Sequence, residues 1–185
     1  MRIVGGTRRG RRLRGPRSAA IRPTQDRVRE TLFNVLGQSF DGGQVLDLYA
    51  GTGAFGLEAL SRGAARAVLV DSGAEAAALC RRNAAELGLL AETEVVQAPV
   101  ARALERLAAD GRRFELVFAD PPYQAGAGAR VVEAAEPVLA EGGTLVVEHD
   151  RREPLPERAG ALVLFDERRF GDTRASLYRR AAANP

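Results

Sequence analysis

Residues 44–56 read QVLDLYAGTGAFG, a short apolar run that includes one acid and opens into a glycine-rich turn. The apolar run is typical of a buried strand, and the residues after the turn continue as a helix rich in alanine and leucine. A strand that enters a helix in this way places its turn at the carboxyl edge of a sheet, where open α/β folds bind their ligands. The stretch therefore predicts an α/β fold with a ligand site at the turn.

The same alternation of short apolar strands and alanine-rich helices continues through most of the chain. The runs AVLV, ELVF and TLVV are apolar throughout, which indicates strands that are covered on both faces. We therefore expect a Rossmann-like, doubly wound and mostly parallel sheet of seven strands. The last two strands flank FGDT (170–173) and are expected to form an antiparallel C-terminal hairpin.

The amino-terminal segment differs from the rest of the chain in charge. All 27 basic residues are arginine. Ten of them lie in residues 1–30 against only Asp26 and Glu30, so this segment carries a net charge of +8 and the remainder −5. Guanidinium groups bind phosphates through paired hydrogen bonds, and the run RRGRRLRGPR is therefore predicted to bind nucleic acid.

Two parts are expected along the 185 residues, a length that suits one domain with a small appendage. Residues 1–40 are expected to form a basic arm for nucleic-acid binding, with a short hairpin around 2–13 and a helix that begins at Pro23 and stops at Gly37. Residues 41–185 form the α/β domain.

The chain contains one cysteine and one histidine, which limits the chemistry that it can carry out. Cys80 cannot form an intramolecular disulfide, and its apolar surroundings predict a buried helical position rather than a nucleophile. With His149 alone, we expect neither a metal site nor a Ser-His-Asp triad. Because no apolar run is long enough to span a membrane and no signal-peptide core is present, we expect a cytoplasmic protein.

The acid and the glycines of the first turn separate two kinds of cofactor. Gly51 and Gly53 allow a tight backbone turn and leave room for a ligand. A carboxylate at Asp47 repels the pyrophosphate of a dinucleotide and attracts the ammonium group of a methionine moiety. The combination favours S-adenosylmethionine over NAD.

Asp71 ends the second strand, eighteen positions after Gly53. An acid at this place can accept hydrogen bonds from both ribose hydroxyls of an adenosine. It can also cap the helix that follows, and the two roles are compatible. Because NAD and S-adenosylmethionine both carry a ribose, this acid indicates a nucleoside cofactor without separating the two.

The most specific motif is Asp120-Pro121-Pro122-Tyr123, which follows the strand FELVFA and is expected at the carboxyl edge opposite the glycine turn. Methylation of an aromatic amino group needs acceptors for its two hydrogens, so that the nitrogen lone pair turns out of the ring plane. Asp120 and a proline carbonyl can accept them, since proline nitrogens cannot donate to a competing ladder. Tyr123 can stack on a base drawn out of its helix or loop.

These motifs resemble the class I methyltransferases with a (D/N)PP(Y/F) signature, and in particular the RsmD family of rRNA guanine-N2 methyltransferases. The resemblance covers nearly the whole chain, through RIVGGTRRGRRL, IRPTQDRVRETLFN, VLDLYAGTGAFGLEALSRGA, FELVFADPPY and RRFGDTRASLYRR. It implies direct methyl transfer from S-adenosylmethionine, without a metal, to N2 of a flipped guanine in 16S rRNA. The implied partner is small-subunit rRNA, free or within a partly or fully assembled subunit, and the implied enzyme is a monomer.

Site residues follow from the motifs and from the resemblance. Those expected to hold the cofactor are Asp47, Gly51, Gly53, Asp71, Thr24 and the backbone N–H of Val100. Those expected to hold and orient the guanine are Asp120, Pro121, Pro122 and Tyr123. Those expected to face RNA are Arg8, Arg9, Arg11, Arg12, Arg22, Arg27 and Arg29; for the last three the resemblance implies RNA or the cofactor mouth.

Three positions depart from the pattern of the family. Asp71 stands where glutamate is common, and its shorter carboxylate should still reach a ribose. Pro99 stands where an acidic or amide residue is expected, which leaves the N–H of Val100 to recognise the adenine. Phe170 replaces a tyrosine, so it has no hydroxyl.

Three alternatives compete with this interpretation. A DNA adenine-N6 or cytosine-N4 methyltransferase uses the same two motifs but normally has an added target-recognition region, for which no segment here is long enough. An NAD-dependent oxidoreductase needs a third phosphate-binding glycine and a catalytic acid such as a tyrosine-lysine pair, and the chain has no lysine. A nucleic-acid-binding module with a decayed site would not be expected to keep residues 120–123 intact.

Overall fold

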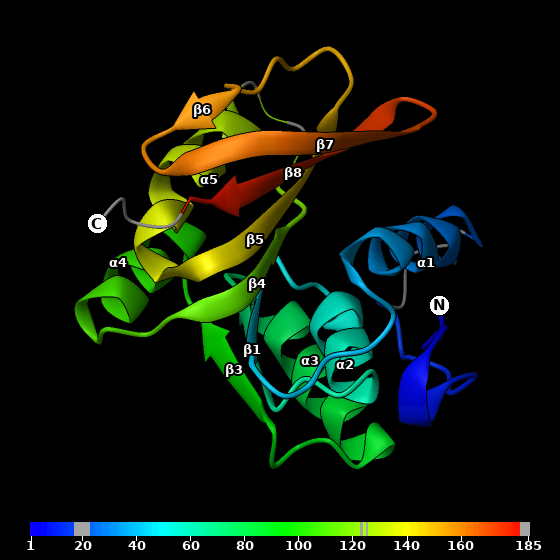
Figure 1. Cartoon of the computed structure of the whole chain (residues 1–185). Helices are drawn as coiled ribbons and strands as arrows, with labels where there is room; N and C mark the ends of the chain where they lie inside the picture. The colour runs from blue at the N-terminus through cyan, green and yellow to red at the C-terminus, as the bar shows by residue number, and fades with distance from the viewer. Residues whose placement is uncertain (17–22, 123, 125, 182–185) are drawn as a thin grey trace. The chain divides into compact units, whose positions relative to one another are not determined.

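The computed structural model describes residues 1–16, 23–122, 124 and 126–181 (Figure 1). The chain divides into two compact units, Met1–Pro99 and Val100–Pro185. In the described part of the chain, no helix is both long and apolar enough to cross a membrane.

The first unit is built on three parallel strands. The strands are β1 (Gln44–Leu48), β2 (Arg66–Asp71) and β3 (Thr93–Gln97), in the order β3-β2-β1. The helices are α1 (Pro23–Leu36), α2 (Ala54–Ser61) and α3 (Ala74–Leu87), with a short 3-10 turn, η1 (Gly6–Arg8). The register pairs Leu48 with Val70 and Asp71 with Gln97, so the three strands end together and bring the following turns to one edge.

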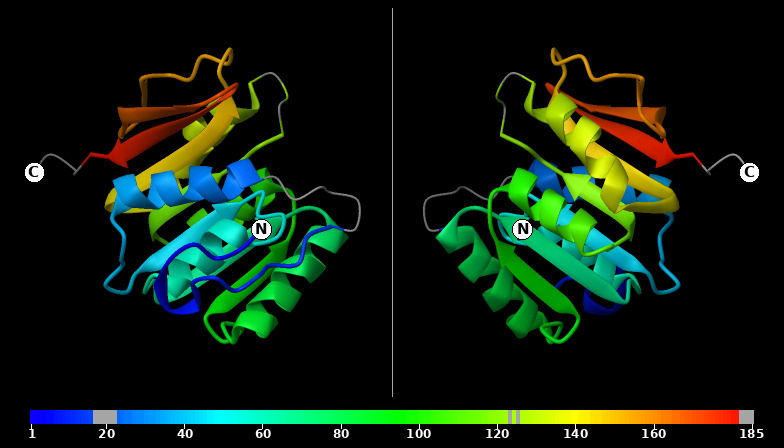
Figure 2. Two further views of the ribbon diagram at one scale, coloured as in Figure 1. Left: turned by 90° about the vertical axis from the view of Figure 1, so that its right-hand side faces the viewer. Right: turned by 90° about the vertical axis from the view of Figure 1, so that its left-hand side faces the viewer.

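Residues 1–14 of the arm lie along α2 and α3 (Figure 2). The predicted hairpin at 2–13 is a single antiparallel bridge between Arg2 and Arg12, tied also by a hydrogen bond from the Ile3 N–H to the Arg11 carbonyl. Ile3 and Leu13 are buried, which anchors this part of the arm through the burial of apolar side chains.

The second unit combines parallel and antiparallel strands. Its strands are β4 (Phe114–Ala119), β5 (Leu139–Asp150), β6 (Arg158–Ala159), β7 (Leu162–Phe170) and β8 (Thr173–Arg180), in the order β4-β5-β8-β7-β6. Its helices are α4 (Val100–Ala109), α5 (Ala127–Ala135) and the 3-10 turn η2 (Glu136–Val138). The strands β4 and β5 are parallel, whereas β5, β8, β7 and β6 pair antiparallel in turn.

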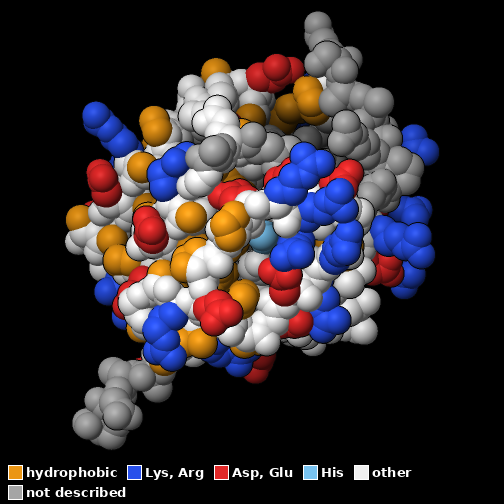
Figure 3. Space-filling view, turned by 90° about the horizontal axis from the view of Figure 1, so that it is seen from above, with side chains coloured by type: hydrophobic (Ala, Val, Ile, Leu, Met, Phe, Trp, Pro, Cys, Tyr) orange, Lys and Arg blue, Asp and Glu red, His pale blue; other side chains and the backbone are white. Residues whose placement is uncertain are grey.

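The single histidine lies at the end of β5, beneath a surface on which arginine side chains gather (Figure 3). His149 is buried, with Nε2 at 2.9 Å from the Ser176 hydroxyl and Nδ1 at 3.0 Å from the Asp150 carbonyl. The polar contacts satisfy both ring nitrogens, so this histidine has a structural explanation.

The α/β fold predicted from the sequence, mainly parallel with an antiparallel hairpin at the C-terminus, is confirmed. One detail was wrong, because the described residues form eight strands rather than seven. The additional strand is β6, which has two residues and pairs with the first residues of β7. Two residues carry no readable hydrophobic period, and only their pairing with β7 makes them a strand.

Candidate functional site

The carboxylate of Asp71 is held by the backbone on both sides of it. Its Oδ2 accepts the N–H of Gly51 at 2.9 Å, and its Oδ1 accepts the N–H of Gly73 at 2.8 Å. Each carboxylate oxygen can accept a further hydrogen bond, and the side chain is only partly buried. The group is therefore pre-oriented and keeps acceptor capacity for two hydroxyls.

The two glycines of the turn differ in what a side chain would meet. A Cβ at Gly51 would have only the Tyr49 carbonyl oxygen near it, at 4.0 Å, so this position borders open space. A Cβ at Gly53 would lie 2.9 Å from Leu69 and 3.3 Å from the sulfur of Cys80. Gly51 can therefore admit a ligand beside the backbone, whereas Gly53 is required by packing; both have positive φ, as does Tyr49.

Asp47 is buried and accepts the N–H of Gly56 at 2.9 Å through Oδ2. The bond holds a carboxylate against the first turn of α2, where the positive end of the helix dipole favours negative charge. Gly56 must lack a side chain here, because a Cβ would come within 2.3 Å of Leu69. Asp47 thus supplies a fixed buried charge behind the turn.

Cys80 lies directly behind the same turn, on α3. Its thiol donates to the Gly51 carbonyl at 3.4 Å. Burial raises the pKa of the thiol to about 12, and the charges of Asp47 and Asp71 act in the same direction. The thiolate is thus disfavoured, and the predicted buried helical position of Cys80 is confirmed.

Asn83 was not predicted from the sequence and joins the turn to the arm. Its side-chain amide donates to the Thr52 carbonyl at 2.8 Å and to the Arg14 carbonyl at 3.0 Å. Its Oδ1 accepts the Arg14 N–H at 2.8 Å. The only sequence signal was a polar residue among the alanines of α3, because these contacts join residues distant in the chain.

In the second unit, Asp120 follows the last residue of β4. Water reaches its side chain, yet the surrounding protein removes enough hydration to raise its pKa from 3.8 to about 6. A shift of this kind is frequent at functional sites, where an acid is placed for its chemistry rather than for stability.

The residues beside Asp120 differ in their exposure. Pro121 is buried and Pro122 is exposed. The carbonyl of Pro122 accepts the N–H of Gln124 at 2.6 Å, so the Pro121 carbonyl is the better candidate for a second acceptor. Tyr123 lies outside the described residues.

Two further predicted cofactor residues lie at helix starts. Val100 is the first residue of α4, where a backbone N–H has no partner within the helix. Thr24 is the second residue of α1, and the structure describes its backbone but not its side chain.

The described arginines predicted to face RNA, apart from the buried Arg29, fall into two groups. Arg9, Arg12 and Arg27 are exposed. Arg8 and Arg11 donate to carbonyls at the C-terminal end of α3, where a cation is favoured by the helix dipole. Each of these two guanidinium groups keeps several donors. Arg22 lies outside the described residues.

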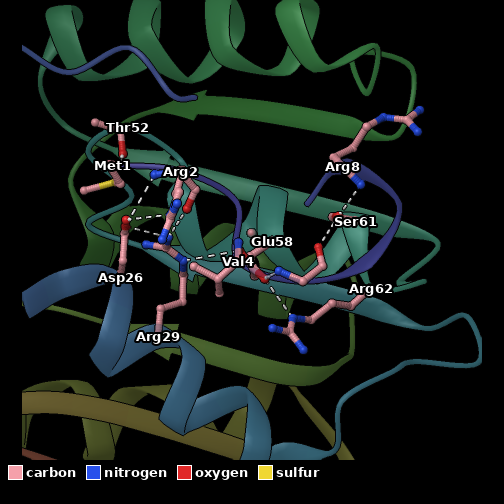
Figure 4. A network of polar contacts seen from close by, with 12 residues as sticks. Met1, Arg2, Val4, Arg8, Asp26, Arg29, Thr52, Glu58, Ser61 and Arg62 are labelled. Carbon is pink, nitrogen blue, oxygen red and sulfur yellow. Dashed lines mark hydrogen bonds and ion pairs between the residues drawn. The ribbon is translucent and has the colours of Figure 1, made fainter. Parts of the chain in front are cut away.

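Arg29 is different, because it is buried inside the first unit (Figure 4). Its guanidinium pairs with Glu58 at 3.4 Å and with Asp26 at 3.0 Å, and it donates to the Arg2 carbonyl. The predicted contact with RNA or the cofactor mouth is therefore replaced by a structural role.

Glu58 is the centre of this network (Figure 4). It is fully buried in α2 and also pairs with Arg62 at 2.8 Å. Its two oxygens accept the N–H groups of Val4 and Gly5 at 2.8 and 2.7 Å. One carboxylate thereby attaches the arm to the helix that follows the glycine turn.

The described residues hold no group of three or more histidine, cysteine or acidic side chains that could bind a metal ion. The acceptors described above instead suit hydroxyl, amino and ammonium donors of organic molecules.

Comparison with known proteins identifies the family. The family model described as "Conserved hypothetical protein 95" matches residues 1–179. The "Ribosomal RNA small subunit methyltransferase D" of Escherichia coli K12 is 38% identical over 184 residues, which covers 98% of this chain and 91% of that protein. The chain belongs to the RsmD family.

The chain is also similar in fold to solved structures. A hypothetical protein of Thermus thermophilus is 36% identical to this RsmD family member, with a TM-score of 0.81 over 96% of this chain and 98% of that one. A 16S rRNA N2 G1207 methyltransferase of T. thermophilus, solved with AdoMet and guanosine, shares the fold with a TM-score of 0.70. It is 22% identical, and the match covers 90% of this chain and 45% of that one.

Proposed function

We propose that this chain transfers a methyl group from S-adenosylmethionine to the N2 amino group of a guanine in small-subunit rRNA, with the base flipped out of its helix or loop. The observation that carries the proposal is Asp120, a water-accessible carboxylate with a raised pKa directly after a buried strand. Membership of the RsmD family supports it, as does the name of the E. coli relative, a small-subunit rRNA methyltransferase.

The residues of the glycine turn fit S-adenosylmethionine. The Asp71 carboxylate, oriented by Gly51 and Gly73, would accept the two ribose hydroxyls. The open space beside Gly51 would admit the methionine moiety, and the buried charge of Asp47 would attract its ammonium group. When bound, this cofactor supplies an electrophilic methyl group on a sulfonium centre.

Asp120 would orient the guanine rather than act as a strong base. It would accept one hydrogen of the N2 amino group, and the Pro121 carbonyl would accept the other. The nitrogen lone pair would then point out of the ring plane, toward the methyl carbon that S-adenosylmethionine would supply. The proton that N2 carries in excess after transfer would pass to water. Positioning and electrostatic preorganisation account for most of such a rate enhancement.

The basic arm would bind the RNA backbone through its exposed arginines. Arg9, Arg12 and Arg27 are the main candidates, with the unused donors of Arg8 and Arg11. These contacts carry no sequence information, so they would set affinity and orientation rather than the choice of guanine. Within this proposal, residues 1–40 are the RNA-binding arm and residues 41–185 the methyltransferase domain.

The test is a methylation assay with labelled S-adenosylmethionine on three substrates: naked small-subunit rRNA, immature small subunits and duplex DNA. Nucleoside analysis should find N2-methylguanosine in one or both RNA samples. The appearance of N6-methyladenine or N4-methylcytosine in DNA alone would refute the proposed substrate, and it would leave the cofactor assignment in place.

Asp71→Ala is expected to weaken cofactor binding before it affects the chemical step. Loss of two charge-assisted hydrogen bonds predicts a rise in the Kd of S-adenosylmethionine of about 10- to 100-fold, with kcat nearly unchanged at saturating cofactor. Isothermal titration calorimetry measures the Kd. Asp41→Ala, an exposed acid of the same unit, is the control and should bind normally. An unchanged Kd for Asp71→Ala would contradict the assignment.

The pH dependence of methyl transfer should report Asp120, whose pKa is raised to about 6 by loss of hydration. The ionised carboxylate is the stronger hydrogen-bond acceptor and stabilises the positive charge that develops on N2, so the single-turnover rate should fall about tenfold per unit of pH below about pH 6. A profile recorded from about pH 5 to about pH 8 tests this. Asp120→Asn should methylate slowly, and its rate should not fall as the pH drops below about 6. If the fall in rate near pH 6 persists in this variant, it comes from the titration of another group.

Stability should change with pH in the opposite sense. The pKa of Asp120 in the folded protein lies above its ordinary value of 3.8. The protonated, neutral form of Asp120 therefore stabilises the folded state relative to the unfolded state. That contribution is present below about pH 4 and is lost as the pH rises through about 6. Asp120→Asn should therefore be at least as stable as the wild type above pH 6, which separates its loss of activity from unfolding.

A further inference from the structure

Five arginines of the second unit surround the turn between β7 and β8, and the proposed reaction gives them no role in RNA binding. We call them the hairpin arginine cluster: Arg151, Arg152, Arg168, Arg169 and Arg174. Blue arginine side chains gather beside the pale blue histidine in Figure 3, with acidic side chains among them. The cluster includes three arginines of the motif RRFGDTRASLYRR, for which the proposed reaction has no use.

Strand register places this cluster at the same edge of the second unit as Asp120. The strands β4 and β5 are parallel and pair Ala119 with Val147, so both end at this edge. Asp150 at the end of β5 pairs with Thr173, the first residue of β8. The hairpin turn thus lies two to three strand spacings to the side of β4 and three residues further along, roughly 15 Å in all, a separation that a few nucleotides of one strand span.

The hairpin brings basic side chains directly opposite one another. Arg169 of β7 pairs with Arg174 of β8, and Arg174 pairs with His149 of β5. Like charges opposite each other in a sheet are destabilising, and this arrangement is therefore a cost to the fold alone. An anion bound between the two guanidinium groups would turn that repulsion into attraction.

The ion pairs within the cluster leave several donors free. Neither Arg152 nor Arg169 forms an ion pair with a described acidic residue. Arg174 pairs with Glu167 through Nη1 at 3.0 Å, yet its Nε has no hydrogen-bond partner among the described residues. That Nε is buried, so the donors open to a bidentate acceptor such as phosphate are those of the exposed Arg152 and Arg169.

The other two arginines of the cluster are paired at the surface. Arg151 lies 3.2 Å from Asp172, and Arg168 lies 2.8 Å from Asp166. Surface pairs of this kind contribute little to stability, so exchange of the carboxylate for a phosphate would cost the fold little. The acids would also hold the guanidinium groups in place while RNA is absent.

We propose that the hairpin arginine cluster binds the phosphates of the RNA strand next to the guanine that Asp120 receives. The proposal rests on the proposed function for the identity of that guanine. It adds a second phosphate-binding surface to the chain, on the opposite end of the sequence from the basic arm.

The test compares two double variants that remove equal charge. Arg152→Gln/Arg169→Gln removes the two arginines of the cluster without ion pairs. The control is Arg106→Gln/Arg158→Gln, in which Arg106 lies on α4 and Arg158 on β6, where β6 pairs with the far end of β7 from the turn. Fluorescence anisotropy with a labelled single-stranded RNA gives Kd as a function of salt, and calorimetry gives the Kd of S-adenosylmethionine.

For the cluster variant we expect RNA affinity to fall about 10- to 100-fold and the salt slope to be smaller by about 1.4, since each phosphate no longer bound lowers the slope by about 0.7. The Kd of S-adenosylmethionine should stay unchanged, and in the methylation assay KM for RNA should rise more than kcat falls. RNA binding and a salt slope equal to those of the control would overturn the proposal. The salt slope is measured without turnover, so it tests the arginine cluster alone. Formation of N2-methylguanosine is a separate measurement, and it tests the proposed reaction.

Discussion

Asp120→Ala is expected to abolish turnover while cofactor binding stays intact. The substitution removes the acceptor that would turn the N2 lone pair toward the methyl group, and no nearby side chain of the described motif replaces it. Loss of a preorganised polar contact of this kind costs about 100- to 1,000-fold in kcat, and a larger loss is expected here because orientation is also lost. Single-turnover methylation of rRNA measures the effect.

The control for this prediction is Asp110→Ala, which removes an exposed acid at the end of α4 in the same unit. It should methylate at the wild-type rate. Calorimetric titration of Asp120→Ala with S-adenosylmethionine should give a Kd close to that of the wild type. Near-normal turnover in Asp120→Ala would remove this residue from the mechanism, and a lost cofactor site would show that its role is structural.

Glu58→Ala is expected to destabilise the protein more than any of the other substitutions. The carboxylate is fully buried and neutralises Arg29 and Arg62, whose side chains are each 6% exposed. Its removal leaves the buried guanidinium of Arg62 without its ion-pair partner, leaves that of Arg29 paired with Asp26 alone, and leaves the N–H groups of Val4 and Gly5 without their acceptor. Breaking a buried pair in this way costs about 3–5 kcal/mol, which predicts a fall in Tm of roughly 10 °C.

Thermal and urea denaturation measure this loss, and limited trypsin digestion shows whether the arm is released. Cleavage after the arginines of the arm should become faster, because the backbone of Val4 and Gly5 is no longer held on α2. Glu86→Gln is the control: this exposed acid pairs with Arg14 and Arg82, which lower its pKa, and its loss should change Tm little. A Tm for Glu58→Ala equal to that of the control would show that the network does not stabilise the fold.

Some roles of the site residues are set by neighbouring residues in the sequence, and others by residues that lie far away in the chain. The turn after β1 could be predicted because strand, acid, glycine and helix lie within thirteen consecutive residues. The distinction between Gly51 and Gly53 could not, because Leu69 and Cys80, which exclude a side chain at Gly53, come from β2 and α3. Asn83 and Glu58 escaped prediction for the same reason, since their partners lie far away in the chain.

The arginines show the same limit most clearly. Composition alone predicts that the arm is basic, but it does not distinguish Arg29 from Arg9. In the folded chain Arg29 is buried and pairs with Glu58, whereas Arg9 is exposed. The hairpin arginines went unnoticed as a group, because acidic residues alternate with them in the sequence and no local excess of charge marks them. Strand pairing then set Arg169 opposite Arg174.

The sequence by itself determined the fold class, the positions of most helices and strands, and the two motifs that suggest methyl transfer. These follow from short-range periodicity and from turn chemistry, which adjacent residues specify. Only the tertiary structure decided which polar side chains are buried in ion pairs and which glycine has open space beside it. Those properties depend on atoms brought together from distant residues, because burial and electrostatic partners arise only when the chain has folded.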